Sequence, residues 1–192
     1  MFGSKLFSIA NQALEGLRVR EIAMPQLRQL MLTTGLTVHM GILERGEAVL
    51  IAKVDSPDVN RLATWIGRRM DVHCTGIGKA LIAYLPPEEL EELLRERSLP
   101  RHNENTIISA KRLIKELESV RNLGFATDDE EDEIGYRCVG VPVLDGENRV
   151  VAAISVAGST SQVTSENMND LVRYLMRTAT AIKTALGEKD ES

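Results

Sequence analysis

Residues 124–145 read GFATDDEEDEIGYRCVGVPVLD, in which six consecutive acidic residues, Asp128 to Glu133, lead almost directly into an apolar segment. Like charges this close repel one another, so a bare acidic run is usually a solvated loop. Here the run is followed by alternating residues that predict a strand over Tyr136–Leu144. A charged segment joined to a strand in this way is the first indication of a binding pocket.

A second alternating segment, Arg149–Ala157, predicts a partner strand, and the Asp145–Asn148 segment between the two predicts a hairpin turn. Because side chains of a strand alternate between its faces, this hairpin has one bulky face and one small face. The bulky face carries Val139, Val141, Val143, Val150, Ala152, Ile154 and Val156. The small face carries Cys138, Gly140, Ala153, Ser155 and Ala157.

The small face leaves volume that either a close-packed helix or a small polar ligand must fill. Since packed cores rarely keep voids, the pattern alone favours the helix. A ligand would instead rest on a floor made by Cys138 and Ser155. A turn symmetric about Gly146 and Glu147 places these two residues opposite each other, whereas a two-residue turn at Asp145-Gly146 places Cys138 opposite Ala153.

Composition narrows the class of protein. The chain has 192 residues, 43% of them hydrophobic and 27% charged, which is typical of one soluble globular domain. Its net charge of −5 argues against direct binding of nucleic acid. No apolar run approaches the ~20 residues of a membrane span, and the first residues lack the profile of a signal peptide. We therefore expect a cytoplasmic protein with no membrane partner.

The remaining patterns predict alternating helices and hairpins, and hence an α+β fold with a mostly antiparallel central sheet flanked by helices. Helices are expected over residues 1–17, 25–35, 75–85, 86–97, 109–123 and 168–186. Further strands are expected over residues 37–43, 48–54 and 61–66, and residues 188–192 are expected to form a disordered tail.

The segment around Thr75 is the second candidate binding element. Thr75 is placed to cap a helix, and Gly76 and Gly78 leave its first backbone amides accessible. A ligand carboxylate could dock on the amides near Gly76 and Ile77, because helix N-termini attract anions. An ordinary capped helix with glycines for close packing fits the same residues. A nucleotide-binding P-loop is excluded, because the glycine and the Ser or Thr that it requires are missing.

Metal binding and thiol catalysis are less favoured. His73, Cys74, His102, Asp128 and Cys138 are ligand types, but only His73 and Cys74 are close in sequence, and their side chains diverge in an extended chain. We therefore expect no dedicated metal site and no cofactor. A buried cysteine is more often an inert apolar residue than a nucleophile.

At these residues the chain resembles the effector-binding domain of the IclR family of bacterial transcription regulators. The resemblance is carried by Gly124-Phe-x-x-Asp128-x-Glu-Glu, Gly135-x-Arg-Cys138-Val-Gly-x-Pro142 and His73-x-Thr-Gly-x-Gly-Lys-Ala80. It covers essentially residues 20–187, and residues 1–19 look like a remnant of the family's linker helix. The family's N-terminal winged helix-turn-helix is missing here, so the chain is expected to be a fragment or a stand-alone sensor.

The resemblance implies a GAF/PAS-like fold, a homodimer or homotetramer, and a pocket for a small organic acid such as a keto acid, sugar acid or aromatic acid. It also implies ligand contacts from Thr75, Gly76, Ile77, Asp128, Cys138, Ser155 and Ala157. Asp128 would accept hydrogen bonds from ligand hydroxyls, at the opposite end of the pocket from the ligand carboxylate. Family members often carry a serine where this chain has Ala157, so one hydroxyl is absent.

Two other functions fit parts of the sequence. A GAF-like thiol enzyme, for instance a small reductase, would use Cys74 or Cys138 and requires a thiol of depressed pKa. A pure oligomerisation module would have its small face filled by protein. Ligand sensing, without catalysis, is the preferred function.

Overall fold

The computed structural model describes residues 2–57 and 62–190, with side chains placed for residues 16–57 and 62–187. Six strands form one antiparallel sheet in the order β3-β2-β1-β6-β5-β4. The strands are β1 Thr37–Glu44, β2 Glu47–Val54, β3 Arg69–Met70, β4 Ala126–Asp129, β5 Tyr136–Leu144 and β6 Val150–Ser159. The helices are α1 Phe2–Thr34, α2 Gly76–Ile82, α3 Pro87–Glu96, α4 Ala110–Leu123 and α5 Met168–Asp190.

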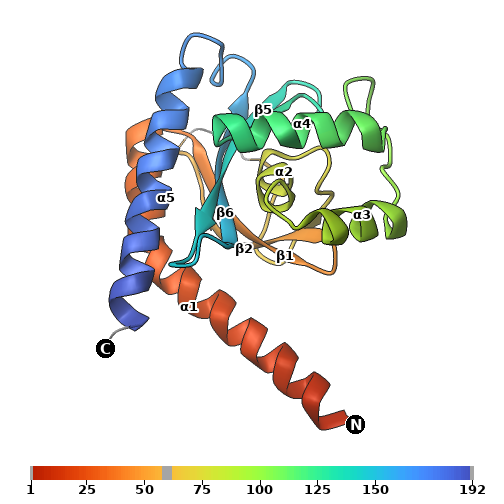
Figure 1. The fold of residues 1–192 in the computed structure, drawn as a ribbon. Coiled ribbons are helices and arrows are strands. Elements are labelled where there is room, and N and C mark those ends of the chain that lie inside the picture. Colours follow the sequence, from red (N-terminus) through yellow and green to blue (C-terminus); the bar gives the residue numbers. More distant parts are fainter. Residues whose placement is uncertain (1, 58–61, 191–192) are drawn as a thin grey trace.

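The sheet separates two layers of helices (Figure 1), which confirms the expected α+β class. On one side α5 packs against the bulky face of β5 and β6, and α1 packs against β1, β2 and α5. The core between these elements contains Val139, Ile154, Leu27 and Leu175. On the other side α2, α3 and α4 enclose a second core. Burial of apolar area on both faces is the main contribution that stabilises such a layered fold.

The N-terminal helix differs from the expectation of two separate helices. Phe2–Thr34 is continuous, with Pro25 inside it. Residues 18–24 contain no glycine or proline that would end a helix, and Ala23 and Leu27 are fully buried on either side of the proline. The expected boundary between residues 19 and 20 therefore lies within one helix. The helix ends where predicted, at Gly35, whose φ of 69° suits glycine.

One strand prediction was wrong, and one strand was missed. Residues 62–66 form no strand, and Arg61 lies outside the described residues; the short strand is Arg69–Met70 instead. The apolar residues that suggested a strand there, Trp65 and Ile66, are exposed. The acidic run, by contrast, begins inside a strand that was not predicted, Ala126–Asp129, which pairs with β5.

The hairpin register differs from both predicted registers, although the predicted faces are correct. Cys138 lies opposite Ala157, and Gly140 lies opposite Ser155. The turn is a three-residue loop that ends in Asn148 at a φ of 62°, and a register shift follows at Val143/Leu144. Together these irregularities move the partner of Cys138 two residues beyond Ser155.

The C-terminal helix is longer than predicted. Its backbone is helical as far as Asp190, so residues 188–190 of the expected disordered tail belong to α5. Residues 191–192 lie outside the described part of the chain.

Candidate functional site

One half of the small face is closed by α2. A Cβ atom built on Gly140 would lie 2.5 Å from the carbonyl oxygen of Gly76, and one built on Gly76 would lie 3.1 Å from the Cys138 sulfur. Backbone therefore packs directly on backbone where β5 passes beneath α2. Ala153 is fully buried in the same core. In this half the helix fills the volume, as the packing argument predicted.

The other half of the small face is open and forms a pocket. Its lining consists of His39, Leu62, Ala63, Thr64, Arg68, Met70, Thr75, Ile77, Asp128, Asp132, Glu133, Tyr136, Arg137, Cys138, Ser155 and Ala157. Six of the seven residues expected to contact a ligand line this pocket. The exception is Gly76, which lies at the edge of the pocket against the Cys138 sulfur.

The two cysteines are not activated. Burial raises the pKa of Cys138 to about 12, although hydrogen bonds from Ser155 and the Gly76 backbone favour the thiolate. Burial, reinforced by the nearby Asp132 carboxylate, also raises the pKa of Cys74 well above its usual value. A catalytic thiol requires the opposite shift. The geometry therefore gives no support to the thiol-enzyme alternative.

Thr75 caps α2 as predicted. Its hydroxyl oxygen accepts a hydrogen bond from the Gly78 amide at 3.1 Å and donates to the Asp71 carbonyl at 2.9 Å. The hydroxyl proton is thus already used within the protein. The Gly76 amide likewise faces the Cys138 sulfur.

Asp128 lies at one end of the pocket, on β4 directly opposite Cys138. Its carboxylate accepts hydrogen bonds from the backbone amides of Glu131 at 2.8 Å and Asp132 at 3.4 Å. Burial nevertheless raises its pKa to about 7, and these hydrogen bonds only partly oppose the shift. Near neutral pH this carboxyl can both donate and accept hydrogen bonds.

Two further residues of the acidic run are anchored by ion pairs. Asp129 pairs with Arg137 at 2.6 Å, and Glu131 pairs with the fully buried Lys79 of α2 at 2.5 Å. Breaking such a buried pair by removing one partner leaves an uncompensated charge, which is strongly destabilising. These contacts fix the turn after β4 against α2, so the wall of the pocket is held in place.

Sequence reasoning missed His39, which lies on β1 beside Ser155 of β6. Its Nε2 is 2.8 Å from the Thr64 hydroxyl. Burial, helped by the positive charge of Lys53, lowers the pKa of His39 to about 4, so the ring is neutral. The available signal was one histidine in the otherwise apolar segment Val38–Leu43.

A basic residue marks the far end of the pocket. Arg68 lines the pocket, stacks over Trp65 at 5.4 Å and donates to the Ala63 carbonyl at 2.5 Å. Its neighbour Arg69 lies outside the lining and pairs with Glu44 and Glu47. Arg68 precedes β3 at one edge of the sheet, whereas Asp128 is on β4 at the other edge. The pocket therefore runs across the middle strands from Arg68 to Asp128. Arg137 of β5 also lines it near the Asp128 end, but its charge is paired with Asp129.

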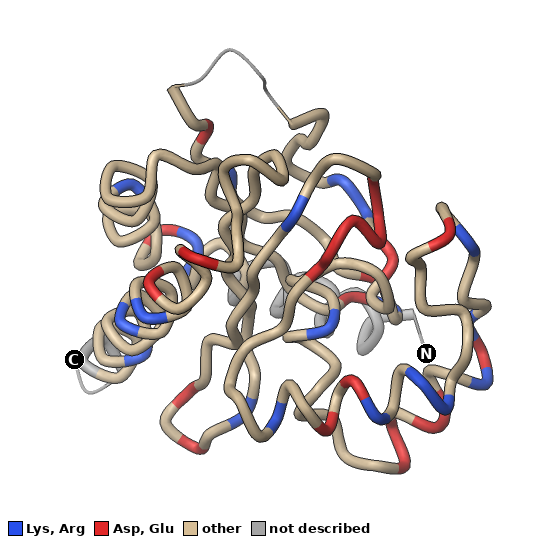
Figure 2. Tube along the Cα trace, turned by 90° about the horizontal axis from the view of Figure 1, so that it is seen from above, with Lys and Arg blue, Asp and Glu red and all other residues tan. Residues whose placement is uncertain are grey.

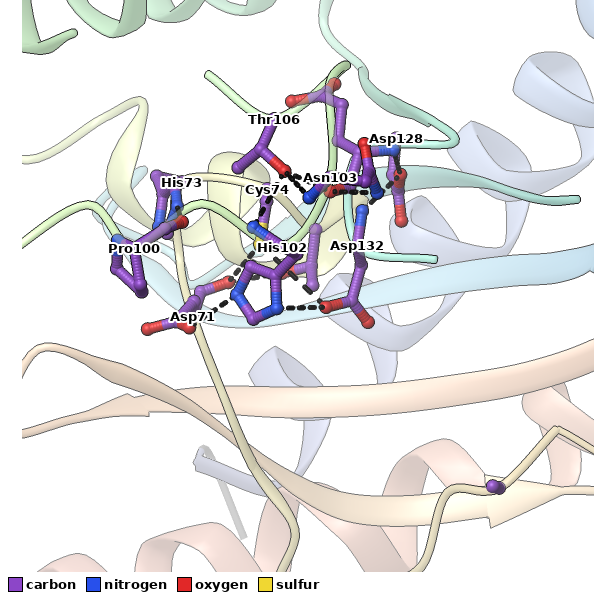
Figure 3. A network of polar contacts seen from close by, with 12 residues as sticks. Asp71, His73, Cys74, Pro100, His102, Asn103, Thr106, Asp128 and Asp132 are labelled. Atoms are coloured by element: carbon purple, nitrogen blue, oxygen red, sulfur yellow. Dashed lines mark hydrogen bonds and ion pairs between the residues drawn. The ribbon is translucent and has the colours of Figure 1, made fainter. Parts of the chain in front are cut away.

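A separate cluster lies behind the Thr75 segment (Figure 3). Ligand atoms of His73, Cys74 and His102 lie within 4.8 Å of one another. The side chains of His73 and Cys74 were expected to diverge in an extended chain, but residues 72–75 form bends, so that condition is not met.

Other surfaces give little indication of function. Lys and Arg are spread over many elements (Figure 2), and no single basic stripe stands out along the described chain. Among the helices that the structure describes, none is long and apolar enough to cross a membrane.

The comparisons with known proteins agree with this geometry. Residues 11–184 match the family model described as "Bacterial transcriptional regulator IclR C-terminal". The chain belongs to the IclR family. It is 36% identical over 186 residues to the HTH-type transcriptional regulator KdgR of Dickeya chrysanthemi, a match that covers 97% of this chain and 61% of that regulator. The chain thus spans less than two thirds of this relative.

Solved structures of IclR-type regulators share the fold. The Thermotoga maritima IclR structure matches with a TM-score of 0.86 and 34% identity, over 93% of this chain and 73% of that one. A double mutant of the PobR inducer-binding domain from Acinetobacter was solved as a complex with 3-hydroxybenzoic acid. It matches with a TM-score of 0.78 and 28% identity, over 85% of this chain and 96% of that one. The relatives are regulators rather than enzymes, so this chain is an IclR-type effector-binding domain with a GAF/PAS-like fold.

Proposed function

We propose that the pocket over Cys138, Ser155 and Ala157 binds a small organic acid that also carries a hydroxyl or keto group. The observation that carries this proposal is the charge layout, with Arg68 at one end and Asp128 at the other. A carboxylate placed at the Arg68 end would gain a charge-assisted hydrogen bond. A ligand hydroxyl or keto oxygen at the Asp128 end would meet a carboxyl group that can both donate and accept.

This orientation differs from docking on the amides at the start of α2. The Thr75 hydroxyl and the Gly76 amide already have partners in the protein, and Asp128 lies next to them across Cys138. A ligand carboxylate at that end would face the ionised form of Asp128. The opposite orientation keeps the two carboxyl groups apart.

A ligand-bound relative supports a small acid. The double mutant of the related Acinetobacter domain holds 3-hydroxybenzoic acid, a molecule with a carboxylate and a hydroxyl at two ends. Keto acids, sugar acids and hydroxylated aromatic acids are therefore the effector classes to test here.

We infer that the domain acts within a cytoplasmic transcription regulator whose DNA contacts come from a winged helix-turn-helix. Binding would favour one conformer of a homodimer or homotetramer and so change DNA affinity. Exposed apolar side chains on α1, including Leu17 and Leu32, support self-association through this helix.

Thermal unfolding against a panel of such acids tests ligand binding. A ligand present at 100 times its dissociation constant stabilises the folded state by about 2.7 kcal/mol, which raises the melting temperature by several degrees. We expect at least one acid to give this shift. A folded sample that responds to no member of the panel contradicts the proposal.

The two adjacent arginines provide a matched test of orientation. Arg68→Gln should weaken binding of the responding acid at least about tenfold, equivalent to about 1.4 kcal/mol, because its carboxylate loses a charged partner. Arg69→Gln removes the same charge outside the pocket and should leave the affinity within about twofold. Equal affinities of the two variants, measured by calorimetric titration, would show that the carboxylate binds elsewhere.

A further inference from the structure

Three metal-ligand side chains converge from two segments of the chain. His73 and Cys74 precede α2, and His102 belongs to the loop between α3 and α4. His73 and Cys74 are almost completely buried, whereas the His102 side chain is one-third exposed. The cluster is thus enclosed on the protein side and reachable from solvent past His102.

Hydrogen bonds orient both imidazoles in the same way. Nε2 of His73 is 3.0 Å from the Pro100 carbonyl oxygen, and Nε2 of His102 is 2.9 Å from a carboxylate oxygen of Asp71. Both partners only accept hydrogen bonds, so each Nε2 carries the proton. Each Nδ1 then keeps a free lone pair. Metal-binding histidines usually have this arrangement, in which the second ring nitrogen donates to a carbonyl or carboxylate.

A carboxylate completes the set. Oδ1 of Asp132 lies 3.9 Å from Nδ1 of His102 and 3.9 Å from the Cys74 sulfur. The view in Figure 3 shows Asp132 beside His102, on the side away from Asp71. Two nitrogens, one sulfur and one carboxylate oxygen therefore border the same space.

We propose that His73, Cys74, His102 and Asp132 form a tetrahedral site for a transition metal of the zinc class. Zinc binds imidazole nitrogen and carboxylate oxygen at about 2.0–2.2 Å and thiolate sulfur at about 2.3 Å, which sets ligand atoms about 3.5 Å apart. The observed separations, up to 4.8 Å among the first three residues, require a contraction of about 1 Å. The exposed loop that carries His102 can supply it.

The charge balance also suits a divalent ion. On binding, Cys74 releases its proton to solvent and becomes a thiolate. The thiolate and the Asp132 carboxylate then neutralise the two positive charges, and the two imidazoles remain neutral. Ligand softness excludes magnesium and calcium, which prefer oxygen ligands alone.

The site is distinct from the effector pocket. Among its four ligands only Asp132 also lines that pocket. A bound ion would join the segment before α2, the loop after α3 and the turn after β4. The ion would stabilise the native state against unfolding even when no effector is bound.

Cobalt(II) titration of the purified chain tests the site, because a thiolate ligand gives a charge-transfer band and tetrahedral cobalt gives visible bands. We expect saturation at one equivalent and displacement by zinc. Zinc should also raise the melting temperature of the chain, and this rise can be measured in the variants described below. His102→Gln, at a partly exposed position that tolerates substitution, should lower the affinity at least about tenfold.

The second cysteine supplies the control. Cys138→Ser should retain the charge-transfer band, and Cys74→Ser should lose it. The proposal is overturned if the wild-type chain gives no such band. It is equally overturned if the band depends on Cys138, or if His102→Gln binds cobalt and zinc as tightly as the wild type.

Discussion

The two halves of the small face of β5 and β6 have side chains of nearly the same volume, but a helix covers one half and the other lines a pocket. Around Gly140 and Ala153 the face is covered by α2 so closely that backbone touches backbone. Around Ser155 and Ala157 the same alternation of small residues lines an open pocket. Small residues therefore do not by themselves indicate a ligand site; the position of the covering helix decides.

Polar groups mark the difference between the halves. The closed half is bordered by apolar residues such as Ile82 and Leu113. The open half is bordered by His39, Arg68 and Asp128. A fully packed core would cut these polar side chains off from solvent. The convergence of these polar groups on one cavity favours a polar occupant.

The closed half should show the largest response to added volume. Gly140→Ala would bring a methyl group to 2.5 Å from the Gly76 oxygen and 2.6 Å from its carbonyl carbon. Neither backbone atom can move without shifting α2, so we expect a loss of about 3 kcal/mol in the free energy of unfolding, measured with urea.

Gly146→Ala is the matched control. No heavy atom lies within 4 Å of a Cβ at that position in the hairpin loop. Its unfolding free energy should stay within about 0.5 kcal/mol of the wild type. Similar stabilities of the two variants would contradict the backbone contact between β5 and α2.

The open half should show a smaller, pH-dependent effect through His39. Its pKa is about 4 in the folded state, against 6.5 when it is exposed, so the unfolded chain binds the proton more readily. The contribution of His39 to the free energy of unfolding is therefore fully present above pH 6.5 and decreases as the pH falls. Between pH 7 and pH 5 the loss should be about 2 kcal/mol.

His39→Gln removes this titration while keeping a polar side chain. The unfolding free energy of the variant, measured with urea at several pH values, should fall less steeply below pH 6.5 than that of the wild type. Parallel curves for the two proteins would show that the ring is not buried in its neutral form.

Much of the site could be predicted because strand alternation fixes faces. The division of β5 and β6 into bulky and small faces follows from period-two spacing alone, and it placed Cys138, Ser155 and Ala157 together. The Thr75 cap was also predictable, since the hydroxyl and the following glycines are local signals.

Features that depend on distant partners could not be predicted. The register of the hairpin is set by a left-handed Asn148 and a bulge, which alternation does not reveal. Asp128 and Asp129 belong to a strand because their backbone pairs with β5 and Asp129 forms an ion pair with Arg137. The run of charge had suggested a loop. His102 joins His73 only through tertiary contact, so sequence spacing gave no signal for the cluster.

The most direct test compares two alanines of β6, four residues apart on the same face, by thermal unfolding with and without a responding organic acid. Ala153→Val should lower the melting temperature, because it overpacks the closed half, and should keep the ligand-induced shift. Ala157→Val should leave the unliganded melting temperature nearly unchanged and abolish the shift, because its methyl groups occupy the pocket floor. If instead both variants retain the full ligand shift, the open half of the small face is not the effector site.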